Sequence, residues 1–341
     1  MTDWFFVCLL AMHLLCVNVS SAGPLVAAWL EWRGRVRTDV QLDQLGRWLA
    51  VNSLWSLLAG SLLGLATAVL LWLDGQWAFF RSVGLVAYKV WWGVAELVFY
   101  VVCMAGYVAL WPRAGRAGGG WLCAHRALAV LAATNLMYHF PPLFGVIAQL
   151  AAQGDLARGP LDAAGFRAEA GAGPVWPMTV HFWLASLAVT GVFAMAWGPG
   201  RERWRDSATS AGAPVSAWLG RLALAATVLQ IPTGMWVLLR LPLAQQGRLV
   251  GGDGLASVLL IAAIALTIWL LHDLASIAMG AASRSRVRRS AALVVLIVLL
   301  MSGTQHRARN PGLVARKFQG SERPQRICSA VAAPAPGEGW P

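Results

Sequence analysis

The most regular feature of the chain is the alternation of long apolar stretches with shorter polar connections. A transmembrane helix needs about 20 consecutive, mostly apolar residues, because the hydrocarbon core of a bilayer is about 30 Å thick. About eight stretches meet this requirement, at roughly 4–30, 48–73, 83–110, 124–150, 178–197, 215–240, 255–281 and 289–303. The pattern predicts an all-α fold: a polytopic transmembrane helical bundle that residues 1–303 form as one domain.

Two of the polar segments are long. Residues 151–177 are rich in Ala, Gly and Pro and could hold a short surface helix. Residues 304–341 are rich in Pro, Gly, Ala and Arg without a hydrophobic period, so we expect a disordered C-terminal tail. The first apolar stretch carries Asp3 and lacks a basic segment before it, which favours a retained helix over a cleaved signal peptide.

Composition supports the membrane assignment. Of the 341 residues, 58% are hydrophobic and 12% are charged, whereas about 25% are charged in typical soluble domains. The mean hydropathy is +0.61. Several of the 19 tryptophans lie at the ends of apolar stretches, where the rings would reach the membrane interface.

The net charge of +12 is distributed unevenly between the connections. Arginines gather in alternate connections, at Arg33, Arg35, Arg37 and Arg47, at Arg113, Arg116 and Arg126, at Arg201, Arg203, Arg205 and Arg221, and at Arg284, Arg286, Arg288 and Arg289. This alternation is typical of the positive-inside rule and predicts both termini outside the cytoplasm of a bacterial inner membrane. The positive charge therefore orients the protein in lipid, and we expect no nucleic-acid partner.

Polar residues inside the apolar stretches are few: His13, Asn18, Asn52, Lys89, Glu96, Asn135, His139, His181, Gln230, His272 and Asp273. Each costs about 2.5 kcal/mol or more at membrane depth if it is charged, so each calls for a partner. The five cysteines include no C-x-x-C-H motif, so the sequence encodes no covalent c-type haem.

Three of the histidines fall at overlapping depths. With a rise of about 1.5 Å per residue, His13 lies near mid-membrane, His139 in the outer half and His181 close to the outer face. Neutral imidazole is the usual axial ligand of haem iron in helical bundles, so the three rings favour a shared cofactor. His272, beside Asp273, lies in the inner third of the membrane and is too deep for the same site.

Structural explanations stand beside these functional ones. Each of the three histidines could be a hydrogen-bonded core residue. Lys89 and Glu96 share a helix face and could be a snorkelling lysine and an internal ion pair. His125, next to Arg126, is expected to be an interfacial residue.

The stretch V-H-F-W-L-A-S-L-A-V-T-G, residues 180–191, resembles the fifth-helix motif of subunit I of cytochrome bd quinol oxidases, with one additional residue after the histidine. Other stretches resemble the same family in the same order, over roughly residues 5–240. They are A-M-H-L-L with Glu31 eighteen residues beyond His13, A-V-N at Asn52, A-E-L-V-F-Y-V-V-C-M-A-G-Y-V-A-L with Glu96, A-A-T-N-L at Asn135 and V-L-Q-I at Gln230.

The resemblance implies roles for individual residues. His181 would ligate a low-spin haem b, His13 would ligate a second haem, and Glu96 would be a nearby proton donor or ligand. Apart from the resemblance, we expect His13 and Glu96 in one interior pocket, because both would face inward at similar depth. Arg240 would pair with a haem propionate. Electrons would come from quinol or a c-type cytochrome, and other respiratory subunits would be partners.

The chain also departs from the family pattern. Met104 replaces the second carboxylate, and the residues 301–309 lack the expected glutamate. The quinol-binding loop is reduced to residues 241–254, the last helix is missing, and no methionine stands opposite His181. His139, followed by two prolines that would bend its helix, is the first candidate for that missing ligand, and Met235 is the second.

The sequence thus predicts a membrane-embedded electron-transfer subunit that binds one or two haems b, within a complex that oxidises quinol or cytochrome c. Two alternatives stay open. One is a haem-free transporter in which the same polar residues conduct protons or ions. The other is a haem-free structural subunit.

Overall fold

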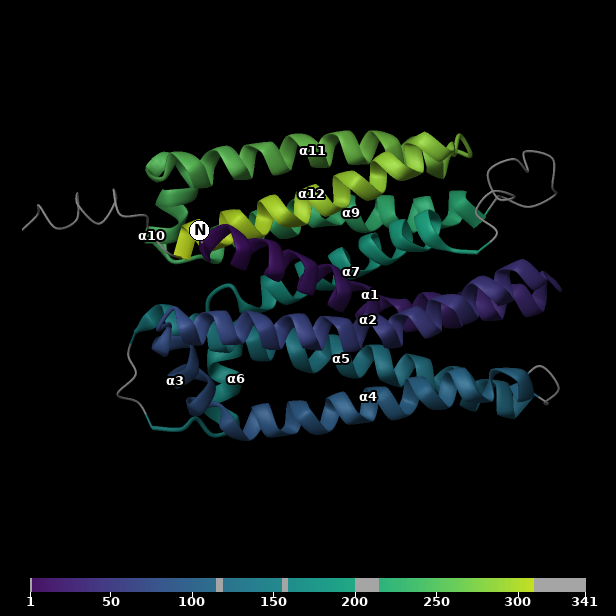
Figure 1. Cartoon of the computed structure of the whole chain (residues 1–341), viewed down its shortest axis with the longest axis horizontal. Helices are drawn as coiled ribbons and strands as arrows, with labels where there is room; N and C mark the ends of the chain where they lie inside the picture. Colours follow the sequence, from purple (N-terminus) through teal and green to yellow (C-terminus); the bar gives the residue numbers. More distant parts are fainter. Residues whose placement is uncertain (1, 115–118, 155–158, 200–214, 310–341) are drawn as a thin grey trace, which may run out of the picture.

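The structure is a computed structural model that describes residues 2–114, 119–154, 159–199 and 215–309. Eight long helices are apolar enough to cross a membrane, which confirms the predicted all-helical membrane bundle. They are α1 (Thr2–Val36), α2 (Val40–Leu73), α4 (Ala87–Ala114), α5 (Gly119–Gln153), α7 (Val175–Trp197), α9 (Val215–Arg240), α11 (Gly254–Ala278) and α12 (Arg284–Arg309) (Figure 1). The described residues contain no strand.

Several helices extend beyond the apolar stretches that predicted them. α12 continues through residues 304–309, which the composition had assigned to the tail. This extension is held in place because Arg307 donates to the Asp253 carboxylate at 2.8 Å and Arg248 donates to the Ala308 carbonyl at 2.7 Å. Residues 310–341, the rest of the predicted disordered tail, lie outside the described residues.

Short helices lie at one end of the bundle. They are α3 (Trp77–Leu85), α6 (Ala163–Gly171), α10 (Leu243–Gly247) and the π-helical turn η1 (Arg248–Gly252). α6 is the predicted surface helix of the 151–177 connection, and Asp162 caps it by accepting from the Gly165 amide at 2.7 Å. α3 ends at a break before Val86, so the third membrane helix begins later than predicted, at Ala87.

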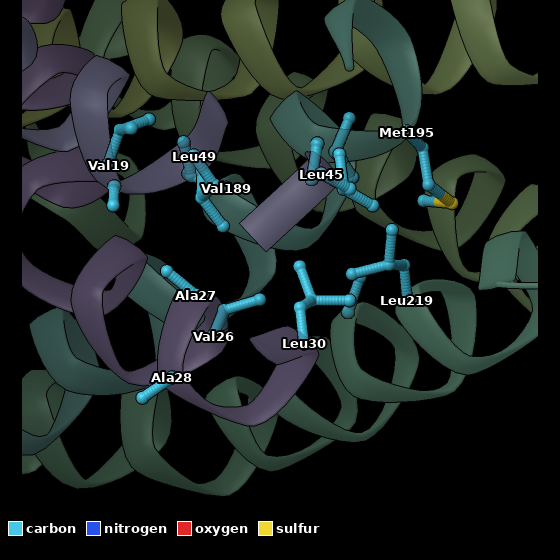
Figure 2. Packing of buried hydrophobic residues seen from close by; sticks show 14 of the residues in the cluster. Val19, Val26, Ala27, Ala28, Leu30, Leu45, Leu49, Val189, Met195 and Leu219 are labelled. Atoms are coloured by element: carbon cyan, nitrogen blue, oxygen red, sulfur yellow. The ribbon is translucent and has the colours of Figure 1, made fainter. Parts of the chain in front are cut away.

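Helices that follow one another along the chain pack as antiparallel pairs: α1 with α2, α4 with α5, α7 with α9, and α11 with α12 (Figure 1). α1 is central and also contacts α5, α7 and α12. Its Val26 and Leu30 share one core with side chains of α2, α7 and α9, including Leu45, Met195 and Leu219 (Figure 2).

Close backbone approach joins α1 to α2. A Cβ on Gly46 of α2 would lie 3.0 Å from the Ala27 carbonyl oxygen of α1, so glycine allows this spacing. Small residues serve this role in membranes, where helix association depends on van der Waals packing and interhelical hydrogen bonds. Tyr100 of α4 supplies one such bond, to the Ser20 carbonyl at 2.7 Å.

The two ends of the bundle differ in charge. The turns from α1 to α2 and from α11 to α12 carry arginines, and they lie at the same end as the last residues of α4 and α7 (Figure 1). We call this the basic end. The short helices and the N-terminus lie at the opposite end (Figure 1). The architecture thus gathers at one end the connections that the sequence separates along the chain.

Candidate functional site

His13 of α1 lies between α1 and α2, half-buried. Its Nδ1–H donates to the carbonyl of Gly60 at 2.7 Å. Gly64, one turn further along α2, makes room for the ring, because a Cβ at that position would lie 2.9 Å from His13 Cε1. The other ring nitrogen, Nε2, makes no hydrogen bond or ion pair with the described residues.

His181 of α7 points toward α9. A Cβ on Gly234 of α9 would lie 3.8 Å from His181 Cε1. The Nδ1 atom of His181 is buried, and no described residue provides it with a hydrogen-bond partner. A buried polar atom without a partner costs about 1–3 kcal/mol, and His181 shares this feature with His125, whose Nδ1 also lacks a hydrogen bond among the described residues.

His139 of α5 faces α4, where its Nε2 lies 3.4 Å from Oε1 of Glu96. Asn135, one turn earlier on α5, donates to the Glu96 carbonyl at 2.8 Å. Glu96 therefore pairs with His139, and no contact joins it to His13, with which it was expected to share a pocket. Pro141 and Pro142 lie within a continuous α5, so its helix is not interrupted beside His139.

The three histidines lie at one level of the bundle. His13 lies five residues before Asn18 and His181 five residues before Ser186, and Ser186 Oγ donates to Asn18 Oδ1 at 2.8 Å between these helices. His139 belongs to the same level, because α5 and α7 are antiparallel and Trp183 Nε1 donates to the Met137 carbonyl at 2.8 Å. The three rings thus share one level, whereas the sequence placed His13 deeper than His181.

The three rings nevertheless face different neighbours: α2 for His13, α4 for His139 and α9 for His181. Their own helices α1, α5 and α7 contact one another, and the rings point outward from this central group. The arrangement provides three separate imidazole positions at one depth, not one cluster. Consistently, the described residues contain no group of three or more His, Cys, Asp or Glu side chains that could hold a metal ion.

The other predicted site residues lie at the surface of the bundle. Arg240 ends α9 and is exposed, and Met235 is 56% exposed. His272 is exposed on α11, while its neighbour Asp273 is buried and accepts from both Arg289 Nε at 2.6 Å and Arg289 Nη2. The buried Asp273, which lies next to His272 in the sequence, is therefore paired with Arg289, whose side chain is partly exposed.

Lys89 does not form the internal ion pair with Glu96. Its Nζ lies 5.3 Å from the centre of the Phe166 ring of α6, in a cation–π contact. The side chain of Lys89 thus reaches toward the end of the bundle opposite the basic end, as expected for snorkelling.

The structure also contains a polar cluster near the basic end that the sequence analysis missed. Its centre is Glu31 of α1, whose side chain is fully buried. Tyr107 of α4 donates to Glu31 Oε2 at 2.9 Å, and Arg35 Nε lies 2.9 Å from Oε1. The cluster, which we call the Glu31 cluster, comprises Glu31, Arg35, Asp43, Tyr107, Trp111, His125 and Arg126.

His125 of α5, expected to be an interfacial residue, is the histidine of this cluster near the basic end and is buried among the helices. Its Nε2 lies 2.8 Å from the Tyr107 carbonyl oxygen, and its Nδ1 lies 3.4 Å from Glu31 Oε2. Arg126 Nε lies 3.7 Å from the other carboxylate oxygen. The sequence signals only one ion pair of this cluster: Glu31 directly follows an apolar run, and Arg35 lies one turn beyond it.

A comparison of the chain with protein-family models and with curated proteins finds no match.

Proposed function

We propose that the protein is a b-haem-binding electron-transfer subunit of a membrane respiratory complex, similar to subunit I of cytochrome bd oxidases. The observation that carries this proposal is the hydrogen bonding of His13. A histidine that ligates a metal usually donates its other ring N–H to a carbonyl or carboxylate, which fixes the tautomer. His13 Nδ1–H donates to the Gly60 carbonyl, which leaves the lone pair of Nε2 for iron.

His181 supports the same proposal. Its Nδ1 is buried without a partner among the described residues, although it lies where α7 and α9 pack together. An axial haem ligand needs only one available imidazole nitrogen, so separate rings on α1 and α7 fit one or two haems without a three-residue metal cluster. The bound haem would supply reversible one-electron transfer.

The chain's own residues would have distinct roles around such haems. His13 and His181 would hold iron, and the pair of Glu96 with His139 would hold and move a proton between carboxylate and imidazole. Arg240, at the end of α9, would meet a propionate. In this proposal the basic end faces the cytoplasm, and quinol or an external c-type cytochrome donates electrons at the opposite end.

Optical spectroscopy of the purified protein tests this function. We expect a sharp α band after reduction with dithionite, and we expect His13→Ala to remove part of it while the protein still inserts. His272→Ala is the matched control, because His272 is exposed and far from this level. A colourless wild-type protein from haem-replete cells would refute the proposal.

Proton or ion conduction without haem is the second candidate function. It is favoured by the Glu31 cluster, whose buried carboxylate, tyrosine and histidine are the residue types of intramembrane proton relays. One experiment distinguishes the two candidate functions. A haem-free protein that dissipates a pH gradient in proteoliposomes would support only proton or ion conduction.

A further inference from the structure

His125 of α5 and Glu31 of α1 meet inside the Glu31 cluster, where both side chains are fully buried. His125 Nδ1 lies 3.4 Å from Glu31 Oε2, and this nitrogen makes no hydrogen bond with the described residues. The opposite ring nitrogen is engaged, because Nε2–H donates to the Tyr107 carbonyl oxygen at 2.8 Å. The pair therefore places one unbonded, buried nitrogen against one buried carboxylate oxygen.

The hydrogen bond at Nε2 fixes the chemical state of Nδ1. A carbonyl oxygen only accepts hydrogen bonds, so the hydrogen of a neutral His125 ring is on Nε2 and Nδ1 carries a lone pair. An ionised carboxylate is also only an acceptor. Two acceptors then face each other in a buried site, and neither lone pair is satisfied. One proton between the two atoms turns this contact into a charge-assisted hydrogen bond.

The two oxygens of Glu31 have different neighbours. The arginines reach Oε1, which lies 2.9 Å from Arg35 Nε and 3.7 Å from Arg126 Nε. Oε2 accepts from the Tyr107 hydroxyl at 2.9 Å and faces His125. Because each carboxylate oxygen has two lone-pair sites, Oε2 can accept a second hydrogen bond. The oxygen that faces His125 is thus available for the proton that the pair lacks.

The cluster is balanced between two charge states. The charged and titratable groups that face the pair are Arg35 of α1, Asp43 of α2, Tyr107 of α4 and Arg126 of α5. Two carboxylates and two guanidinium groups cancel when the histidine is neutral, and one added proton leaves a single positive charge. The carboxylate of Glu31 attracts this proton and the two arginines oppose it, so the site is suited to bind the proton and to release it.

The cluster is accessible from the basic end. Asp43, near the start of α2, is its most exposed charged member, with 34% of its side chain exposed, and it lies within ion-pair distance of Arg35. The pair of Glu31 and His125 is buried behind these two side chains. Protons of the aqueous phase at the basic end therefore reach the pair through the rim of the cluster.

We propose that His125 and Glu31 form a proton-binding site, in which one proton from the aqueous phase at the basic end is shared between Nδ1 and Oε2. With the proton bound, the distance between these atoms shortens from 3.4 Å to about 2.7–2.9 Å. Because His125 is also bonded to α4, the proton joins α1 to the pair of α4 and α5. This site is independent of both candidate functions, since it requires neither haem nor passage of the proton across the membrane.

The pH dependence of unfolding tests the proposal. The purified full-length protein is unfolded by SDS in mixed micelles between about pH 5 and pH 8, where imidazole groups exchange protons. A proton that the folded pair binds more tightly than the unfolded chain stabilises the fold. The amount of SDS needed for half-unfolding should therefore be largest at the acidic end and fall as the pH rises.

His125→Gln should remove this part of the pH dependence, because its amide still donates toward the Tyr107 carbonyl but does not titrate. The difference in slope between wild type and variant should approach about one proton taken up on folding. His272→Gln is the matched control, since His272 is exposed on α11, and it should keep the slope of the wild type. Equal slopes for wild type and His125→Gln would overturn the site.

Solid-state NMR detects the proton without relying on the stability of His125→Gln. The protein carries isotopic labels in its histidine rings and glutamate carboxyl groups. Because His139 also faces a glutamate at 3.4 Å, the measurement uses His139→Gln, so that the ring close to a labelled carboxyl group is His125. We expect this ring to carry hydrogens on both nitrogens at about pH 5 and on Nε2 alone at about pH 8. A ring with the same protonation state at both pH values would refute the proposal.

Discussion

His125 and His181 occupy the same bundle but differ in what surrounds their rings. Each ring nitrogen of His125 faces an oxygen, the Tyr107 carbonyl on one side and the Glu31 carboxylate on the other. His181 has a buried Nδ1 that no described residue satisfies. His125 Nδ1 makes no hydrogen bond among the described residues either, but it lies at ion-pair distance from the Glu31 carboxylate, whereas no carboxylate of the described residues faces His181 Nδ1 in this way. A buried nitrogen without such a neighbour lowers stability, which is typical of groups kept for function.

The Glu31 cluster and the level of His13, His139 and His181 also differ in how many helices they connect. The Glu31 cluster draws side chains from α1, α2, α4 and α5, so its charges are balanced across four helices. The histidine level instead distributes its rings over three separate helix contacts. We therefore expect substitutions in the cluster to change stability, and substitutions at the histidine level to change binding of the proposed haem.

The largest effect is expected for His181→Ala, which should abolish one haem signal entirely. Iron ligation requires the imidazole nitrogen, so no neighbouring side chain replaces it. The reduced spectrum per folded protein measures the loss, and the unfolding free energy should change by less than about 2 kcal/mol because an unsatisfied polar atom is removed with the ring. Spectra of wild type and variant that superimpose would exclude His181 as a ligand.

Glu31→Gln should cause the next largest effect, a destabilisation of about 3–5 kcal/mol, because it leaves buried arginine charge without its partner. SDS titration in mixed micelles, followed by tryptophan fluorescence, measures it. Asp74→Asn is the control, since Asp74 is an exposed carboxylate at the end of α2. Adding Arg126→Gln should restore part of the stability, and additive losses would show that the two charges do not interact.

The helices could be predicted from the sequence because a membrane span is a property of its own residues. Length and apolar content identify each of the eight spans, whereas helix rise alone placed His13 deeper than His181, although the two lie at one level. The direction in which each histidine ring points does not follow from the sequence, because it depends on which helix packs alongside. His13 and Glu96 seemed partners at similar depth, yet one faces α2 and the other α5.

The Glu31 cluster could not be predicted for the same reason. Glu31, Tyr107 and His125 belong to three helices, and only tertiary packing reveals that their side chains meet. Asp273 shows the same limit, because its partner in space is Arg289, sixteen residues away in the sequence.

A smaller effect is expected for Gly64→Ala. The new Cβ would lie 2.9 Å from His13 Cε1, so the ring must shift away from the Gly60 carbonyl. Overpacking of this kind costs about 1–3 kcal/mol, and the shift should reduce the haem signal assigned to His13 without removing that of His181. Gly84→Ala is the control, because a Cβ there meets no atom within 4 Å. Equal spectra for Gly64→Ala and wild type would show that His13 holds no iron.

The smallest effect is expected for His139→Ala. Its ring faces Glu96 on α4, whereas His181 faces Gly234 on α9, so His139 is not placed to complete the ligand set of a haem held by His181. A partly exposed ion pair contributes about 1 kcal/mol or less, so stability should hardly change. The low-spin or high-spin character of the His181 haem should also be preserved, as measured by its Soret and α bands. A conversion from low spin to high spin would instead show that His139 moves to the iron when haem binds. The two regions would then differ in rigidity as well as in hydrogen bonding, because His125 is held by a hydrogen bond at Nε2, whereas His139 has only the 3.4 Å contact with Glu96.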